Sequence, residues 1–158
     1  MISDSINNQS EYALFQVSVK SLIIDNGKLL TLYSSDGKYD FPGGRINGNE
    51  VEYDLELSLK REIEEELSKE FKFKINNFAF SSKRFYVKNN QRFDILVTFF
   101  DTTAVNRQIK LSDEHTSFEL LTFSEIFKNP DKFVSEEEYR ELKKYLSFFK
   151  KQYNNGRS

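Results

Sequence analysis

The chain has 158 residues, a formal net charge of −2 and no cysteine. One domain of about 100–150 residues accommodates most of this length, and 38% hydrophobic with 30% charged residues is an ordinary globular balance. The lack of cysteine excludes disulfides, thiolate zinc sites and cysteine nucleophiles. The small net charge excludes a global attraction to nucleic acid or to an anionic membrane, although it leaves local basic patches open.

The N-terminal region shows no pattern of a targeting segment. Residues 1–11 are polar and lack the basic and then apolar order of a signal peptide. The longest apolar stretches fall far short of the ~20 residues that a membrane span needs. We therefore expect a cytoplasmic protein with one domain over 11–153, a flexible lead-in at 1–10 and a flexible tail at 154–158.

The first half of the chain predicts strands followed by one helix. In chain order the expected features are a strand over 12–24, an Asn-Gly turn at 26–27, a strand over 29–33, a turn over 34–37, an extended segment over 39–41, a Pro-Gly-Gly break at 42–44 and a polar loop over 45–53. The helix is expected from about Asp54, its N-cap, to about Lys69.

The second half predicts more strands and two further helices. The expected features are strand material over 71–87 with an interruption near 76–77, an Asn-Asn turn at 89–90, a strand over 92–103, a short strand over 120–123, a short helix capped by Ser124 that stops before Pro130, and a final helix capped by Ser135 that runs to about Lys150. This order, without repeats or a linker, predicts a single α/β domain.

The helix expected over 54–69 carries acidic residues beside its apolar stripe. At about 100° per residue, four apolar side chains share one stripe: Leu55, Leu59, Ile63 and Leu67. Glu62, Glu65 and Glu66 are related by steps of three and four residues and therefore share one face. Glu66 falls within the edge of the stripe and Glu62 beside it, whereas Glu64 and Arg61 point further toward solvent.

Two interpretations of this acidic face stay open on spacing alone. A solvated face is the ordinary interpretation, but such a face lies opposite the apolar stripe, and this one borders it. Three carboxylates at this spacing repel one another unless a cation lies between them. Mg²⁺ binds to a few carboxylates, waters and phosphate oxygens, which suits this cluster. Arg61 can pair with Glu65 at i+4 and orient its carboxylate.

The sequence FPGG at 41–44, followed by REIEEE at 61–66, resembles the box motif of the Nudix hydrolase family. That motif reads Gly, five residues, Glu, seven residues, then Arg-Glu-apolar-any-Glu-Glu-any-Gly-apolar. Gly44 and Glu50 satisfy the first spacing, and the Arg-Glu-apolar-any-Glu-Glu core is complete. The resemblance implies a Nudix-type α/β/α sandwich with a mixed central sheet.

The chain departs from the motif in two places. Ten residues rather than seven separate Glu50 from Arg61, so the loop is longer and Glu52 competes with Glu50 for the place of the first Glu. Ser68 stands where the family has the Gly that ends the helix, and Lys69 stands where an apolar residue is usual. We therefore expect this helix to end differently from the family's.

The resemblance also implies a metal centre. The Gly43 carbonyl and the carboxylates of Glu62, Glu65 and Glu66 would bind Mg²⁺ or Mn²⁺, and Arg61 would orient the carboxylates. The metals would neutralise the diphosphate and lower the pKa of the attacking water. In the family the general base is often a Glu of the box, here Glu62 or Glu65, or an acidic residue of a later loop.

The segment 112–115 resembles the acidic loop that many family members carry. Glu114 is the candidate there for an additional ligand or for the base, and a helix-dipole contact in a first turn is the alternative. His115 is expected near the site, although a lone histidine is more often structural.

Substrate contacts are predicted less sharply. The glycines let the backbone approach a phosphate, so Gly44 and the following Arg45 are candidate phosphate contacts. Arg84, beside the turn at 89–90, is a third candidate, although an exposed charge on a hairpin more often serves solubility. The expected partner is a small nucleotide-like molecule, and both a monomer and a homodimer stay open.

The expected function is metal-dependent hydrolysis of a diphosphate linkage in a nucleoside diphosphate derivative. A non-catalytic nucleotide-binding or regulatory module is the first alternative, and three clustered carboxylates argue against it. An isoprenoid diphosphate isomerase is disfavoured because that branch of the fold uses a cysteine. A hydrolase acting on the 5′ ends of RNA is the last alternative, and the net charge of −2 disfavours nucleic acid as the substrate.

Overall fold

The computed structural model describes residues 12–115 and 117–155, apart from the side chains of 152–155. In chain order its elements are β1 (Gln16–Asp25), β2 (Lys28–Tyr33), β3 (Tyr39–Asp40), β4 (Gly43–Arg45), the 3-10 helix η1 (Gly48–Glu50), α1 (Leu55–Leu67), β5 (Phe73–Lys88), β6 (Gln91–Ala104), β7 (Ser117–Thr122), α2 (Phe123–Phe127), the 3-10 helix η2 (Pro130–Lys132) and α3 (Glu136–Asn155).

The strands form one mixed sheet. Its main path runs β3-β2-β1-β6-β5, with β4 paired to β1 and β7 paired to β2. The β1–β6 pair is parallel, and the other strand pairs of the described residues are antiparallel. The long chain between β1 and β6 includes α1, as a crossover between parallel strands requires.

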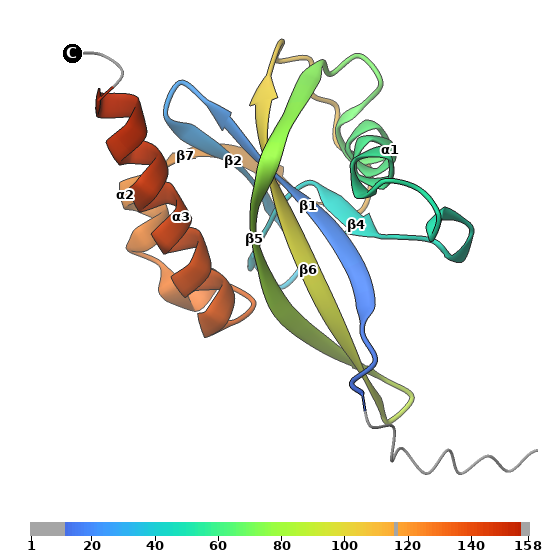
Figure 1. Ribbon diagram of the computed structural model, residues 1–158. Coiled ribbons are helices and arrows are strands. Elements are labelled where there is room, and N and C mark those ends of the chain that lie inside the picture. Colours follow the sequence, from blue (N-terminus) through green and yellow to red (C-terminus); the bar gives the residue numbers. More distant parts are fainter. Residues whose placement is uncertain (1–11, 116, 156–158) are drawn as a thin grey trace, which may run out of the picture.

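Helices cover both faces of this sheet, as Figure 1 shows, with α1 on one side and α2 and α3 on the other. The core on the α1 side contains Val19, Ile23, Leu30, Leu32, Leu59, Ile63, Leu67, Phe71 and Phe100. The core on the α3 side contains Leu22, Leu29, Tyr39, Phe41, Phe80, Val97, Phe99, Ile126, Phe133, Leu142 and Leu146. The apolar stripe predicted for the first helix is confirmed, and the fold is the predicted α/β/α sandwich.

Strand β1 changes partner along its length. Its last residues pair with β2, at Ile24↔Leu29, whereas its middle pairs with β4, at Lys20↔Gly43. Gly43 has φ +136, and a Cβ there would overlap the Val19 carbonyl oxygen, so only glycine lets the backbone come so close. Two of the three residues of the break predicted at 42–44 therefore belong to β4, a short strand that lies against β1.

The predicted hairpin turns are formed by the residue types that favour them. Asn26, Asn89 and Asn90 all have positive φ, as the central residues of tight hairpin turns do. The interruption expected near 76–77 is a bulge, because the register of β5 against β6 shifts between Ile75 and Phe80.

Two predicted boundaries are wrong. Helix α2 is capped by the Thr122 hydroxyl, which accepts from the Glu125 amide at 3.2 Å, and not by Ser124. Helix α3 starts after Ser135 as predicted but continues to Asn155, past Lys150 and into the expected tail. The predicted lead-in at 1–10 lies outside the described residues. No helix within the described ranges is long and apolar enough to cross a membrane.

Candidate active site

Arg61 gathers three carboxylates on the surface of α1. Its Nε and Nη2 donate to the two oxygens of Glu50 at 2.6 and 3.0 Å. Nη2 also lies 2.7 Å from Glu62 Oε1, and Nη1 donates to Glu65 Oε2 at 3.0 Å. The predicted i+4 pair of Arg61 and Glu65 is therefore confirmed, and the planar guanidinium holds all three acids in fixed relation.

The loop before α1 folds so that Glu50 reaches Arg61. Glu50 is buried in η1, and its carboxylate accepts the Asn47 amide at 2.7 Å. The hydrogen bonds from Arg61 hold the pKa of Glu50 below its usual value. Glu52, the competing candidate, is exposed. Despite the three extra loop residues, Glu50 rather than Glu52 therefore contacts the Arg61 guanidinium.

Glu66 and Glu62 lie against the glycine backbone of β4. The Gly43 amide donates to Glu66 Oε2 at 2.8 Å, and burial raises the pKa of Glu66 to about 7. Burial also raises the pKa of Glu62. A Cβ at Gly44 would overlap the Glu62 carboxylate, so glycine is required for this approach. Burial removes these two carboxylates from water, so a bound cation would stabilise their ionised forms.

The donor set of this site suits a hard divalent cation. Glu62, Glu65 and Glu66 supply carboxylate oxygens, which Mg²⁺ and Mn²⁺ prefer, and the Glu65 side chain is 60% exposed. As the side chains of residues 12–115 and 117–151 stand, no three acidic or histidine groups converge closely enough to hold an ion. Arg61 instead occupies the space between Glu62 and Glu65.

A second charged cluster adjoins the carboxylates on the far side of Gly43. Lys20, on β1, donates to the Gly43 carbonyl at 2.8 Å and to Asp40 Oδ2 at 3.1 Å. His115 Nε2 lies 3.5 Å from the same Asp40 oxygen, and its Nδ1 lies 4.0 Å from Glu66 Oε1. Burial opposes ionisation of Asp40, but Lys20, His115 and Arg84 outweigh it and hold its pKa well below the usual range.

Arg84 belongs to this cluster, so the expectation of an exposed hairpin charge is wrong. Its side chain is 12% exposed, and Nε and Nη2 donate to the Glu138 carboxylate at 2.7 and 2.6 Å. Nη1 donates to Asp40 at 3.3 Å. The guanidinium is thus satisfied by α3 and β3, and a contact with substrate stays a prediction.

The other predicted contacts lie on the surface. Arg45 Nη1 donates to the Tyr86 hydroxyl at 2.8 Å and to Gln16 at 3.1 Å, and its guanidinium lies 4.9 Å from the Tyr86 ring centroid. It follows Gly44 directly in sequence, and its side-chain partners come from β1 and β5. Glu114 is exposed in the loop before β7, so its role as a base or ligand stays a prediction.

Sequence reasoning missed Lys20, Asp40 and Glu138. A signal existed for two of them. Lys20 interrupts the apolar run of the first strand, and Asp40 directly precedes the FPGG sequence. Glu138 stands among three successive acids at the start of α3, and nothing in the local pattern distinguishes it.

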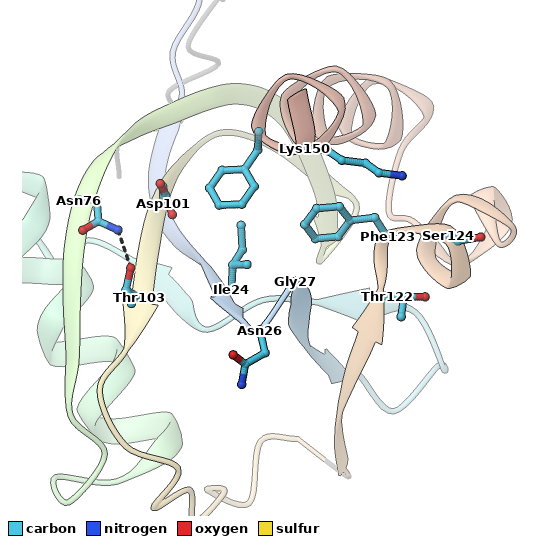
Figure 2. Close-up of a pocket in the computed structure, with 11 residues that line it drawn as sticks. Ile24, Asn26, Gly27, Asn76, Asp101, Thr103, Thr122, Phe123, Ser124 and Lys150 are labelled. Atoms are coloured by element: carbon cyan, nitrogen blue, oxygen red, sulfur yellow. Dashed lines mark hydrogen bonds between the residues drawn. The ribbon is translucent and has the colours of Figure 1, made fainter. Parts of the chain in front are cut away.

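A separate cavity of about 520 Å³ lies further along the α3 face of β1. Figure 2 shows Ile24, Phe123 and Asp101 around it, with the Asn76 amide donating to Thr103 at 2.9 Å. Burial raises the pKa of Asp101. No residue from 43 to 66 lines this cavity. On the same face of β1, the buried Leu22 separates Ile24, which lines the cavity, from Lys20. The cavity is therefore distinct from the carboxylate site.

Comparisons with known proteins identify the fold. Neither the profiles of known families nor curated protein sequences gave a match. Among solved structures, the MutT protein from Methanosarcina mazei Go1 has a TM-score of 0.65 at 22% identity, over 83% of this chain and 92% of that one. A NUDIX hydrolase from Nitrosomonas europaea has a TM-score of 0.66 at 15% identity, over 85% and 90%. A UDP-X diphosphatase has a TM-score of 0.56 at 20% identity, over 96% and 68%. The chain has the Nudix fold.

Proposed function

We propose that this protein is a metal-dependent diphosphohydrolase that cleaves a diphosphate linkage in a nucleoside diphosphate derivative. One observation carries the proposal: Arg61 gathers Glu50, Glu62 and Glu65, while Glu66 is buried against the Gly43 amide. Buried carboxylates beside a glycine backbone can hold a cation together with its anionic ligand. They would not help to bind an anion alone. The names of structurally similar proteins, among them a UDP-X diphosphatase, support the substrate class.

In this proposal Glu62, Glu65 and Glu66 would hold Mg²⁺ or Mn²⁺, which would supply neutralisation of the phosphate oxygens and polarisation of the attacking water. Arg61 fixes the carboxylates through its three ion pairs. Arg45, exposed next to Gly44, contacts a phosphate oxygen. Water adds to one phosphorus, and the bridging oxygen leaves with the other phosphoryl group, so the products are two phosphate-bearing molecules.

The test is a product-release screen with the purified protein. Nucleoside triphosphates, ADP-ribose, a UDP-linked sugar, dinucleoside polyphosphates and a 5′-triphosphorylated RNA would each be incubated with Mg²⁺ or Mn²⁺, with EDTA as the control. Metal-dependent cleavage of a small nucleotide supports the proposal, and cleavage of the RNA alone would assign the 5′-end activity instead. Nucleotide binding without any cleavage would contradict hydrolysis.

Two neighbouring substitutions make the assignment specific. Glu65→Gln removes one ligand charge with little change of volume and should reduce kcat by more than the ~10–100-fold loss typical of outer partners of a metal. Glu64→Gln changes the adjacent residue, which has no part in the Arg61 cluster, and should leave kcat nearly unchanged. Equal activity of the two variants would contradict the assignment of the metal site.

A further inference from the structure

Lys20 places an ammonium group inside the candidate active site. Its side chain is only 7% exposed, and it extends from the part of β1 that pairs with β4. Nζ lies 2.8 Å from the Gly43 carbonyl oxygen and 3.1 Å from each oxygen of Asp40. Its charge also acts on Glu62 and Glu66, whose ionisation it favours.

Both polar backbone groups of Gly43 therefore have hydrogen-bond partners. Its amide donates to Glu66 Oε2, and its carbonyl accepts from Lys20. Gly43 cannot turn away easily, because a close approach to Val19 and the register with Lys20 hold it against β1. The carbonyl that the Nudix resemblance assigns to a metal already binds a cation that belongs to the chain.

We propose that Lys20 is a built-in cation of this site, which takes the place of one divalent ion at the Gly43 carbonyl. An ammonium and a divalent ion on the same carbonyl oxygen would repel each other strongly in a buried setting. The carboxylates of α1 then bind fewer ions than they would bind without Lys20. This inference rests on the metal site of the proposed function, and it assigns Lys20 a positioning role there.

A buried ion pair with a purely structural role makes a different prediction. If Lys20 served only to neutralise Asp40, its removal would lower stability and leave metal binding unchanged. The number of bound ions per chain therefore separates the two roles, and it is measured without any substrate.

The experiment is a titration of the full-length protein with Mn²⁺, with free Mn²⁺ followed by electron paramagnetic resonance. Lys20→Met keeps most of the side-chain volume and removes the charge, and we expect it to bind one more Mn²⁺ per chain than the wild type. Lys74→Met removes an exposed positive charge on β5 and controls for the change in net charge. It should bind the same number of ions as the wild type.

The outcomes distinguish this inference from the proposed function. Equal numbers of ions and equal affinity in the wild type and Lys20→Met, or weaker binding by Lys20→Met, would overturn the role of Lys20 alone. If neither protein binds Mn²⁺, the metal site of the proposed function fails as well. Binding that Glu62→Gln abolishes in both proteins would place the ions at the α1 carboxylates.

The variant must fold for this comparison to hold. Lys20→Met leaves Asp40 with Arg84 and His115 as partners. Thermal unfolding would check the fold. If the single variant is unstable, the double variant Lys20→Met/Asp40→Asn removes the carboxylate that has lost its lysine partner. The double variant should likewise bind one ion more than Asp40→Asn, and the same number in both would overturn the inference.

Discussion

At the scale of single residues, Asp40 is a carboxylate whose charge the fold requires. It is paired with Lys20 at 3.1 Å and with Arg84 at 3.3 Å, and these partners hold its pKa well below the ordinary 3.8. Because the pKa is lowered in the folded state, the stabilisation is complete above pH ~4 and is lost as the pH falls toward the folded value. Asp40 therefore contributes to acid unfolding.

Asp40→Asn tests this contribution. At pH 7 we expect the free energy of unfolding to fall by about 3 kcal/mol, because two buried cations lose a charged partner. Toward pH 2–3 the wild type loses its own contribution from Asp40, so the gap between the two proteins should narrow. Urea unfolding at both pH values measures the gap, and a gap independent of pH would contradict the assignment.

Ser68 ends α1 in a conformation that disfavours a side chain. It has φ 112 and ψ 159, a region that is nearly restricted to glycine and costs about 1–3 kcal/mol for other residues. The family motif has glycine at this position. The Ser68 hydroxyl donates to the Gln108 carbonyl at 3.1 Å, which offsets part of the cost on an exposed surface.

Ser68→Gly should therefore raise the free energy of unfolding by about 0.5–1 kcal/mol, after the lost hydrogen bond and the greater freedom of the unfolded chain are subtracted. Ser68→Ala keeps the strain and loses the hydrogen bond, so it should be slightly less stable than the wild type. Chemical unfolding of the three proteins gives their order. A glycine variant that is less stable than the alanine variant would show that strain is not the dominant effect.

At the scale of elements, the Glu138–Arg84 pair connects α3 to β5. Glu138 is fully buried at the first turn of α3, and its two oxygens accept from the Arg84 fork at 2.6 and 2.7 Å. The helix start is fixed by Ser135, whose hydroxyl accepts the Glu138 amide at 3.1 Å. Truncation of Glu138 leaves a buried guanidinium with Asp40 as its remaining acid.

Glu138→Ala should lower the free energy of unfolding by about 3–5 kcal/mol, the usual effect of breaking a buried pair on one side. Glu137→Ala is the matched control, because Glu137 is a neighbour with a third of its side chain exposed and only Lys83 at 3.9 Å. It should change stability by less than about 1 kcal/mol. The double variant Glu138→Ala/Arg84→Met should recover part of the loss, and no recovery would assign the effect to packing.

At the scale of the whole molecule, the parts predicted from sequence are those with a local cause. The hairpin turns need Asn or Gly at positive φ, and the α1 stripe and its acidic edge follow from the helix period. The Arg61–Glu65 pair needed only one turn of helix. These features depend on neighbours within a few residues.

The parts that could not be predicted depend on chain topology. Lys20 and Arg84 meet at Asp40, and Glu138 pairs with Arg84, because β1, β3, β5 and α3 converge there. No spacing in the sequence encodes this meeting. For the same reason Arg84 looked like an exposed charge beside a turn. The 3-10 helix that brings Glu50 to Arg61 could not be predicted either, because the longer loop departs from the spacing of the motif.

Metal binding should couple the site to the stability of the entire fold. Glu66 is buried and Glu62 is half-buried, and Arg61, Lys20 and the Gly43 amide compensate their charges. A ligand that binds only the folded state stabilises it by RT ln(1 + [L]/Kd), or about 2.7 kcal/mol at a hundred times Kd. For a chain of this size that corresponds to a rise in Tm of roughly 5–10 °C.

Differential scanning calorimetry with increasing Mn²⁺ measures this rise, and EDTA should reverse it. Glu62→Gln/Glu65→Gln removes two of the three proposed ligands while the apolar stripe of α1 stays intact, so its Tm should no longer respond to Mn²⁺. A Tm that rises equally in both proteins would place the stabilising ion elsewhere. A response confined to the wild type would connect the carboxylates of one helix to the stability of the whole sandwich, because single domains of about this size generally unfold as one cooperative unit.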